Sequence, residues 1–201
     1  MFRDNIQFKN LIDSHEEKFL NNYWATYKRI LFESRDDETI VQIKKIFKKV
    51  SKDGGKIIFV GNGASASLSS HAATDFTKQA KIEAIAFNDH NLITALSNDY
   101  GYEFWVSKAI ELYSANDDML IFISVSGESK NLINGIDFAN KNNLKTASLT
   151  GSKENNKLRS KSDTSLWVDS KAYNIVESIH TIWITLIIDM FVGHPEYTVN
   201  E

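Results

Sequence analysis

The segment GNGASASLSSHAATD, residues 61–75, brings glycines and polar residues directly after the apolar run IIFV. Gly61 and Gly63 satisfy a loose Gly-x-Gly-x-x-Ala pattern, in which glycines permit a tight turn and a close backbone approach to phosphate at a helix N-terminus. The same residues fit a plain strand-to-helix turn in which Ser65 or Ser67 caps the helix. Taken alone, the segment leaves open a nucleotide-binding turn, a sugar-phosphate site and an ordinary helix start.

His71 and Asp75 are spaced four residues apart in the same segment. On a helix this spacing places both side chains on one face, as a shared metal site or proton-transfer site requires. Asp75 could instead form a surface ion pair with Lys78, which would stabilise an exposed helix by only about 0.3 kcal/mol. Both interpretations remain open from the spacing alone.

The turn SVSGES, residues 124–129, overlaps the end of the apolar run MLIFIS and precedes a helix expected to begin near Asn131. Ser124, Ser126 and Ser129 bring hydroxyls to a helix N-terminus, where unpaired backbone N–H groups and the helix dipole favour an anion. Two polar turns at the carboxyl ends of parallel strands indicate a ligand site, because ligands of open α/β sheets bind there. Since the chain lacks a Gly-Lys-Ser/Thr turn, a nucleoside triphosphate is not expected.

These turns must be positioned by the surrounding elements. Apolar residues recur at helical spacing from Ile6 to Val50, which predicts two or more amphipathic helices. Beyond them, short apolar runs alternate with helical patterns, which is typical of a parallel sheet buried on both faces. The sequence therefore predicts an α/β fold with a helical N-terminal extension. The predicted strands are residues 57–60, 82–87, 119–124, 146–149 and 165–168, and the last strong helix is expected at about 173–191.

The bulk properties favour one domain over residues 1–201, with a helical segment 1–54 and an α/β core 55–193, because 201 residues that are 42% hydrophobic can build one sizeable core. A formal net charge of −3 indicates no nucleic-acid partner, and the absence of cysteine excludes disulfides and thiolate metal sites. We expect no signal peptide and no window that approaches the length of a membrane span, and hence a cytoplasmic protein without a membrane partner. Wide apolar faces near both ends favour an oligomer.

Three stretches carry a family resemblance: GNGASASLSSHAATDFTK, DHNLITALSNDYGYE and ISVSGESKNLINGIDFANKNNLKTASLTG. They resemble the sugar isomerase (SIS) domain family, and within it the phosphoheptose isomerases, over roughly residues 56–189. The resemblance implies a three-layer α-β-α sandwich with a five-stranded parallel sheet, and a homotetramer with active sites at subunit interfaces. It also implies an enediol conversion of sedoheptulose 7-phosphate into D-glycero-D-manno-heptose 7-phosphate for lipopolysaccharide biosynthesis.

The resemblance implies substrate contacts for residues of both polar turns. The serines of the second turn correspond to residues that hold the phosphate, and residues of the first turn correspond to sugar contacts. An acidic residue beyond the second strand and one on the C-terminal helix also correspond to substrate-contacting positions. The substrate-binding residues implied in this way are Asn62, Ser65, Asp89, Ser124, Ser126, Ser129 and Glu177.

The resemblance further implies a proton-transfer site and, as in some members, a zinc site. Asp75 takes the place of a glutamate that acts as the proton-transfer base, and its side chain is one methylene shorter. His71, Asp75 and Glu177 correspond to metal ligands, so zinc is the cofactor that the resemblance implies, with water completing the coordination shell.

The C-terminal helix departs from the family pattern. Glu177 takes the place of a glutamine, His180 matches the neighbouring histidine, and a second catalytic histidine falls on Thr185. A threonine hydroxyl does not exchange protons near neutral pH as imidazole does, and His180 lies about 140° around the helix from Thr185. We predict Asp75 and His180 as the catalytic residues. Glu177 and His180 also fit a plain buried hydrogen-bonded pair.

Three functions remain open. The first is an isomerase of phosphorylated seven-carbon sugars, which we predict from the intact serine turn. The second is an isomerase of another phosphosugar, and the third is a non-catalytic phosphosugar-binding or regulatory module, which Thr185 favours. A nicotinamide-dependent enzyme fits least, because the serine turn would then have no role.

Overall fold

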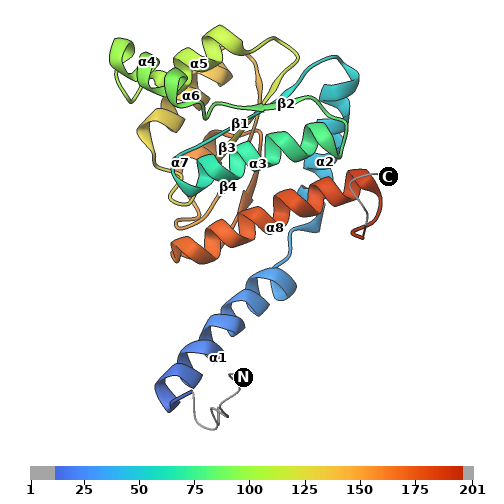
Figure 1. Ribbon diagram of the computed structural model, residues 1–201, viewed down its shortest axis with the longest axis vertical. Coiled ribbons are helices and arrows are strands. Elements are labelled where there is room, and N and C mark those ends of the chain that lie inside the picture. The colour runs from blue at the N-terminus through green and yellow to red at the C-terminus, as the bar shows by residue number, and fades with distance from the viewer. Residues whose placement is uncertain (1–11, 197–201) are drawn as a thin grey trace, which may run out of the picture. The chain divides into compact units, whose positions relative to one another are not determined.

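The computed structural model describes residues 12–196, and the chain divides into two compact units, residues 1–35 and 36–201. The predicted start of the helical segment at Ile6 lies outside the described residues. The larger unit is an α/β sandwich built around one parallel sheet (Figure 1). The predicted fold class is therefore confirmed.

The smaller unit is helical. Helix α1 (Ser14–Lys28) continues directly into a single π-helical turn, η1 (Arg29–Glu33). The helix starts at a capping box, because the Asp13 carboxylate accepts the backbone N–H of Glu16 at 2.8 Å and the Glu16 carboxylate accepts that of Asp13 at 2.9 Å. None of the α1 residues is buried, although the helix carries a row of large aromatic side chains.

The sheet has five parallel strands in the order β2-β1-β3-β4-β5. Strands β1 and β3 are buried at every residue, as their uninterrupted apolar runs predict. All five strands lie where the sequence predicts them, with β2 shorter at both ends than expected. The strands are β1 (Ile57–Gly61), β2 (Ala84–Ala86), β3 (Met119–Ser124), β4 (Lys145–Thr150) and β5 (Thr164–Trp167).

Helices cover both faces of this sheet (Figure 1). One face carries α2 (Asp37–Lys52), α3 (Ala64–Lys78) and α8 (Tyr173–Val192). The other face carries α4 (His90–Tyr100), α5 (Trp105–Tyr113), α6 (Lys130–Lys141) and α7 (Lys157–Lys161). Helix α2 thus belongs to the larger unit, because its buried apolar face packs against α8 and β5.

Alternating side chains of the central strands build a core on each face. Ile58 and Val60 join the apolar cluster under α5 and α6. On the other face, the ring of Phe76 lies 5.6 Å from that of Phe59 and 5.2 Å from that of Phe47. All three rings are completely buried. This aromatic cluster fixes α3 and α2 against the sheet, and α3 is the helix that carries the first predicted site residues.

The turn from β1 into α3 depends on glycine. A Cβ at Gly61 would lie 2.6 Å from the Cβ of Ser65, so only glycine lets the helix start this close to the strand end. The residue that caps α3 is Gly63, with φ +57°, and no side chain caps the helix. The alternative of a Ser65 or Ser67 cap is therefore wrong, because both serines lie inside the helix.

Helix α8 corrects the expectation that no window approaches the length of a membrane span. By length and composition alone, this 20-residue helix is long and apolar enough to cross a bilayer. Eight of them are buried, however, and the helix packs on α2, α3 and β4. A mostly apolar helix in such surroundings is typical of the core helix of a globular domain.

Replacement of Phe76 by alanine removes a fully buried ring from the aromatic cluster. We expect Phe76→Ala to lower the free energy of unfolding by about 3–5 kcal/mol, through lost apolar burial and the cavity that remains. Leu112→Ala, on the exposed side of α5, is the control and should change that free energy by less than about 0.5 kcal/mol. Urea unfolding measures both, and equal changes in the two variants would contradict the assignment of this core.

Candidate functional site

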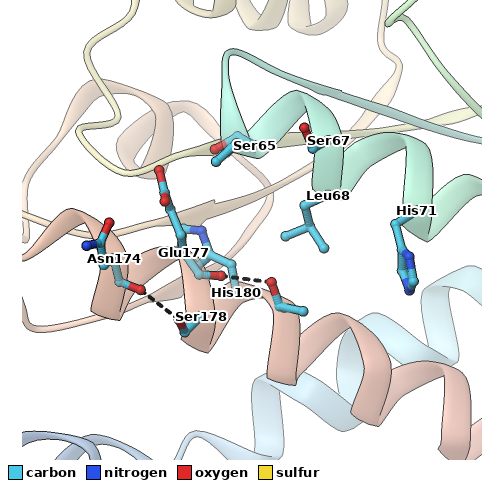
Figure 2. Close-up of a pocket in the computed structure, with 10 residues that line it drawn as sticks. Ser65, Ser67, Leu68, His71, Asn174, Glu177, Ser178 and His180 are labelled. Carbon is cyan, nitrogen blue, oxygen red and sulfur yellow. Dashed lines mark hydrogen bonds between the residues drawn. The ribbon is translucent and has the colours of Figure 1, made fainter.

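A cavity of about 550 Å³ opens between α3 and α8 (Figure 2). Its size suits a small polar metabolite. Polar side chains from both helices face it, so the structure brings the predicted residues His71 and Glu177 to one cavity. The lining residues are Ala64, Ser65, Ser67, Leu68, His71, Asn174, Glu177, Ser178, His180 and Thr181.

His71 and Asp75 form a hydrogen-bonded pair along one face of α3. The His71 Nε2 lies 3.0 Å from the Asp75 Oδ2, and the His71 side chain is 58% exposed whereas that of Asp75 is 20% exposed. His71 lines the cavity, and Asp75 is not among the lining residues. The structure therefore brings the predicted pair together but places Asp75 behind the imidazole. The alternative of an ion pair with Lys78 is not observed, because the carboxylate is engaged by His71.

His180 is completely buried in the wall of the cavity. Its Nε2 lies 3.2 Å from the carbonyl oxygen of Thr150, the last residue of β4. Because a carbonyl can only accept, Nε2 carries the proton and Nδ1 is a bare acceptor, for which the described residues offer no partner. Burial lowers the pKa of His180 to about 4, against the smaller opposing effect of the Thr150 carbonyl. The ring is thus neutral near pH 7, and it does not pair with Glu177.

Glu177 and Thr185 differ in what they offer to the cavity. The Glu177 carboxylate is half-buried and points from α8 toward the start of α3, where Ser65 lies (Figure 2). The Thr185 hydroxyl donates to the carbonyl of Thr181 at 3.0 Å, within its own helix, and Thr185 is not a lining residue. The position where the family pattern has a second histidine therefore does not line this cavity.

The serine turn after β3 presents free hydroxyl hydrogens. Ser124 Oγ accepts the backbone N–H of Gly127 at 3.1 Å, and Ser126 Oγ accepts that of Glu128 at 3.2 Å. Both hydroxyls are therefore oriented by the backbone and keep their own hydrogens for an acceptor. Ser129 is the N-cap of α6, and its side chain makes no capping bond. This arrangement can bind a phosphate group.

The serine turn is held in place by the segment that leads into α7. Gly127 has φ +65°, and a Cβ there would lie 2.0 Å from the Oδ1 of the fully buried Asn156. At the next residue of the same segment, the backbone N–H of Lys157 donates to the Glu128 carboxylate at 3.1 Å, and the Lys157 ammonium pairs with that carboxylate at 3.0 Å. The hydrogen bond from Lys157 holds the pKa of Glu128 below its usual value. Contacts from this one segment therefore hold the serine turn in place without a ligand.

Asp89 serves the fold in this structure. It is the N-cap of α4, and its Oδ1 accepts the backbone N–H of Asn91 at 2.9 Å and of Leu92 at 3.1 Å. A carboxylate that caps a helix start in this way has a complete local explanation. The substrate contact predicted for Asp89 stays a prediction.

Two buried amides were not found from the sequence. Asn131 is 2% exposed and hydrogen-bonds Asn62, which is predicted to contact the sugar. Asn156 holds the serine turn as described above. Asn131 could have been noticed, because it lies among the apolar residues on the buried side of α6, such as Leu132 and Ile136. A polar residue on such a face requires a partner.

The predicted zinc site is not assembled by this chain. Over residues 12–196, no three His, Cys, Asp or Glu side chains gather closely enough to hold a metal ion. His71 and Asp75 bond to each other, and Glu177 projects from a different helix toward Ser65. Tetrahedral zinc requires three protein ligands around one point. The set His71, Asp75 and Glu177 therefore does not fit zinc within one chain, because Glu177 does not complete a cluster.

The fold and both polar turns define a sugar isomerase domain. A model of the SIS domain family matches residues 18–151, which is more than half of the chain. The chain belongs to the SIS domain family, and the resemblance stated from the sequence is confirmed.

Within this family, the relatives that match at 30–37% identity include phosphoheptose isomerases. The phosphoheptose isomerase of Helicobacter pylori strain HPAG1 is 37% identical over 146 residues, which cover 70% of this chain and 76% of the relative. That of Fusobacterium nucleatum is 30% identical over 199 residues, or 96% of this chain and 100% of the relative. The solved phosphoheptose isomerase of Neisseria gonorrhoeae superimposes with a TM-score of 0.80 at 26% identity, covering 89% of this chain and 99% of the other.

The buried His180 predicts a pH-dependent stability. Its pKa is about 4 in the folded protein and about 6.5 when unfolded, so the unfolded chain binds the extra proton between these values. The stabilising effect of the neutral ring is complete above the unfolded pKa and is lost as the pH falls through this window. Between about pH 7.5 and pH 5, wild type should lose about 2 kcal/mol more free energy of unfolding than His180→Gln.

Urea unfolding at a fixed protein concentration measures this difference. Glutamine does not titrate and keeps an N–H for the Thr150 carbonyl, so the other titrating groups cancel in the comparison. An identical loss of stability in wild type and variant would show that His180 is not held neutral by burial.

Proposed function

We propose that this chain isomerises sedoheptulose 7-phosphate to D-glycero-D-manno-heptose 7-phosphate. The observation that carries this proposal is the serine turn 124–129, whose oriented hydroxyls lie at the carboxyl end of a central parallel strand. Membership of the SIS domain family and the names of the relatives point to the same reaction.

The serine turn would hold the phosphate of the substrate. Ser124 and Ser126 have hydroxyl hydrogens to donate, and Ser129 stands at the start of α6, where the helix dipole favours an anion. Asn62 lies in the turn after β1, and Ser65 lies in the first turn of α3 and lines the cavity; the backbone N–H of Ser65 bonds the Asn62 carbonyl at 3.1 Å. They would therefore contact the sugar between its phosphate and its reacting end.

The reaction moves protons between neighbouring carbons and oxygens. A base removes a proton from C1 of the ketose as the enediol forms, a proton is returned to C2, and a hydroxyl proton is transferred between the oxygens. We assign the transfer of the carbon-bound proton to the His71–Asp75 pair. The His71 imidazole would face the substrate in the cavity, and the Asp75 carboxylate would orient the imidazole. The Glu177 carboxylate, on the facing helix, would exchange the hydroxyl proton. This assignment does not use His180, which was predicted as catalytic, because its Nδ1 is buried and its Nε2 bonds the Thr150 carbonyl.

Turnover of sedoheptulose 7-phosphate by the purified protein tests the proposal. We expect wild type to form the aldose and, in deuterated water, to incorporate deuterium at C2, as proton exchange on an enediol base requires. Asp75→Ala should lower kcat by about 10²- to 10⁴-fold, and Ser124→Ala or Ser126→Ala should lower kcat/KM by about 10- to 100-fold. NMR follows both product and isotope.

One substitution serves as a matched control. Ser107→Ala removes a serine hydroxyl from α5, where it bonds the Phe104 carbonyl. It should leave kcat/KM within about twofold. Binding of the sugar phosphate without turnover would favour a binding or regulatory module, and turnover of a different phosphosugar would favour the related isomerase. Product without deuterium at C2 would contradict exchange of the carbon-bound proton with solvent at the His71–Asp75 pair.

We further propose that the enzyme is a cytoplasmic homotetramer and that residues 1–201 act as one SIS domain. Exposed apolar side chains on each unit support assembly, since large exposed patches of this kind mark protein contacts. Phe19, Trp24 and Phe32 are 61%, 62% and 71% exposed in the N-terminal unit, and Ile182 and Leu186 are 39% and 41% exposed on α8.

Charge placed in the aromatic row of α1 should weaken the assembly. We expect Trp24→Lys combined with Phe19→Lys to shift the protein from a tetramer to smaller species, because two ammonium groups would have to lose water in an apolar contact. Light scattering after gel filtration measures the mass. His15→Lys, at an exposed position of the same helix, is the control. A tetramer that survives the double substitution would exclude this face from the interface.

A further inference from the structure

The side-chain amides of Asn62 and Asn131 form a reciprocal pair. Asn62 Nδ2 donates to Asn131 Oδ1 at 3.0 Å, and Asn131 Nδ2 donates to Asn62 Oδ1 at 2.9 Å. The two residues are 69 positions apart in the sequence. One lies in the turn after β1 and the other in the first turn of α6, after the serine turn. The pair therefore connects the two polar turns of the candidate site.

Tyr102 adds a third contact to this pair. Its hydroxyl donates to Asn62 Oδ1 at 3.2 Å, although the residue as a whole is 58% exposed. Both lone pairs of Asn62 Oδ1 are then occupied, by Tyr102 and by Asn131, and one of its two N–H groups is occupied by Asn131. What Asn62 retains is a single N–H donor and no side-chain acceptor.

The network lies where the sheet topology opens a crevice. Strands β1 and β3 are neighbours, but the chain leaves β1 toward β2 through α3 and leaves β3 toward β4 through α6, on opposite faces. Ligands of open α/β sheets bind at this point of divergence. Asn131 is 2% exposed, and a buried amide that lost its partner would be costly, so the pair persists without a ligand.

We propose that Asn131 and Tyr102 are positioning residues that fix Asn62 as a donor-only group facing the substrate. The proposal rests on the proposed function and adds a rule of recognition to it. Asn62 can bind an oxygen that accepts, such as a phosphate, carbonyl or hydroxyl oxygen, and it cannot bind a group through that group's N–H or O–H. The two residues act through Asn62 and do not themselves touch the reacting atoms.

Double-mutant cycles on the full-length enzyme test this role. Tyr102→Phe should lower kcat/KM by about 5- to 10-fold and Asn131→Ala by about 10- to 100-fold, the effects expected for one and two lost hydrogen bonds. In an Asn62→Ala background, each change should lower kcat/KM by less than about twofold further, because the group they position is gone. Tyr102→Phe should leave the melting temperature unchanged within error, since its ring is exposed.

Tyr100→Phe is the matched control. Tyr100 is a nearby tyrosine, 49% exposed, whose ring stacks under the Lys108 ammonium, and its hydroxyl has no part in the network. It should leave kcat/KM within about twofold. If Tyr102→Phe or Asn131→Ala costs as much in the Asn62→Ala background as in wild type, the effects are independent and the proposal is overturned.

A second measurement separates this proposal from the proposed function. The side-chain N–H resonances of Asn62 in ¹⁵N-labelled protein do not depend on turnover. We expect one slowly exchanging and one rapidly exchanging N–H in wild type, and two rapidly exchanging ones in Asn131→Ala. If wild type shows no turnover, the proposed function fails while this pattern still supports the positioning role. Equal exchange of the Asn62 protons in wild type and Asn131→Ala would overturn it.

Discussion

The parallel pairing of β1 with β3 at the centre of the sheet is the constraint on which the candidate site depends. The register sets Gly61 opposite Ile123, so the turns that follow these strands leave the same edge at nearly the same level. Neither strand can shift, because every residue of both is buried between the two helical layers. The turns after β1 and β3, which are far apart in the sequence, are thereby held close enough for the side chains of Asn62 and Asn131 to hydrogen-bond.

The fold could be predicted because its signals are local and repeated. Apolar runs such as MLIFIS coincide with β3 at both ends, and the last helix was predicted to within one residue. The limits of β2 were less predictable, since Ile82 is buried but extends the apolar run without pairing to β1. The unit boundary after Arg35 was not predictable either, because α1 and α2 show similar helical spacing while only α2 buries its apolar face.

Site residues were predictable where a strand end or a helical spacing determines their place. They were less predictable where a side chain has more than one available hydrogen-bond partner. Ser124 and Ser126 had to lie at a strand end, and they do. The spacing of His71 and Asp75 predicted a shared face, but not that Asp75 would stand behind the imidazole. Asp89 and Asn131 illustrate the remaining difficulty. A polar residue near a helix start can cap that helix or reach across the site, and spacing alone does not distinguish a local partner from one 69 residues away.

The serine turn and the altered positions Asp75 and Thr185 lie on different elements of the fold. The chain can therefore combine an intact serine turn with altered catalytic positions. The groups expected to bind phosphate are held by the sheet edge, by the Gly127–Asn156 contact and by the Glu128–Lys157 pair. Helix α8 reaches this region through Thr150, whose carbonyl contacts His180 and whose hydroxyl accepts from Asn156. The groups expected to move protons stand on α3 and α8, which meet only through their own packing. Asp75 pairs with His71 on α3, and the Thr185 hydroxyl bonds the Thr181 carbonyl within α8, so neither altered position belongs to the contacts that hold the serine turn. His71 and Glu177 bring an imidazole and a carboxylate to the cavity from facing helices, and these are the functional groups that the proposed enediol reaction would use.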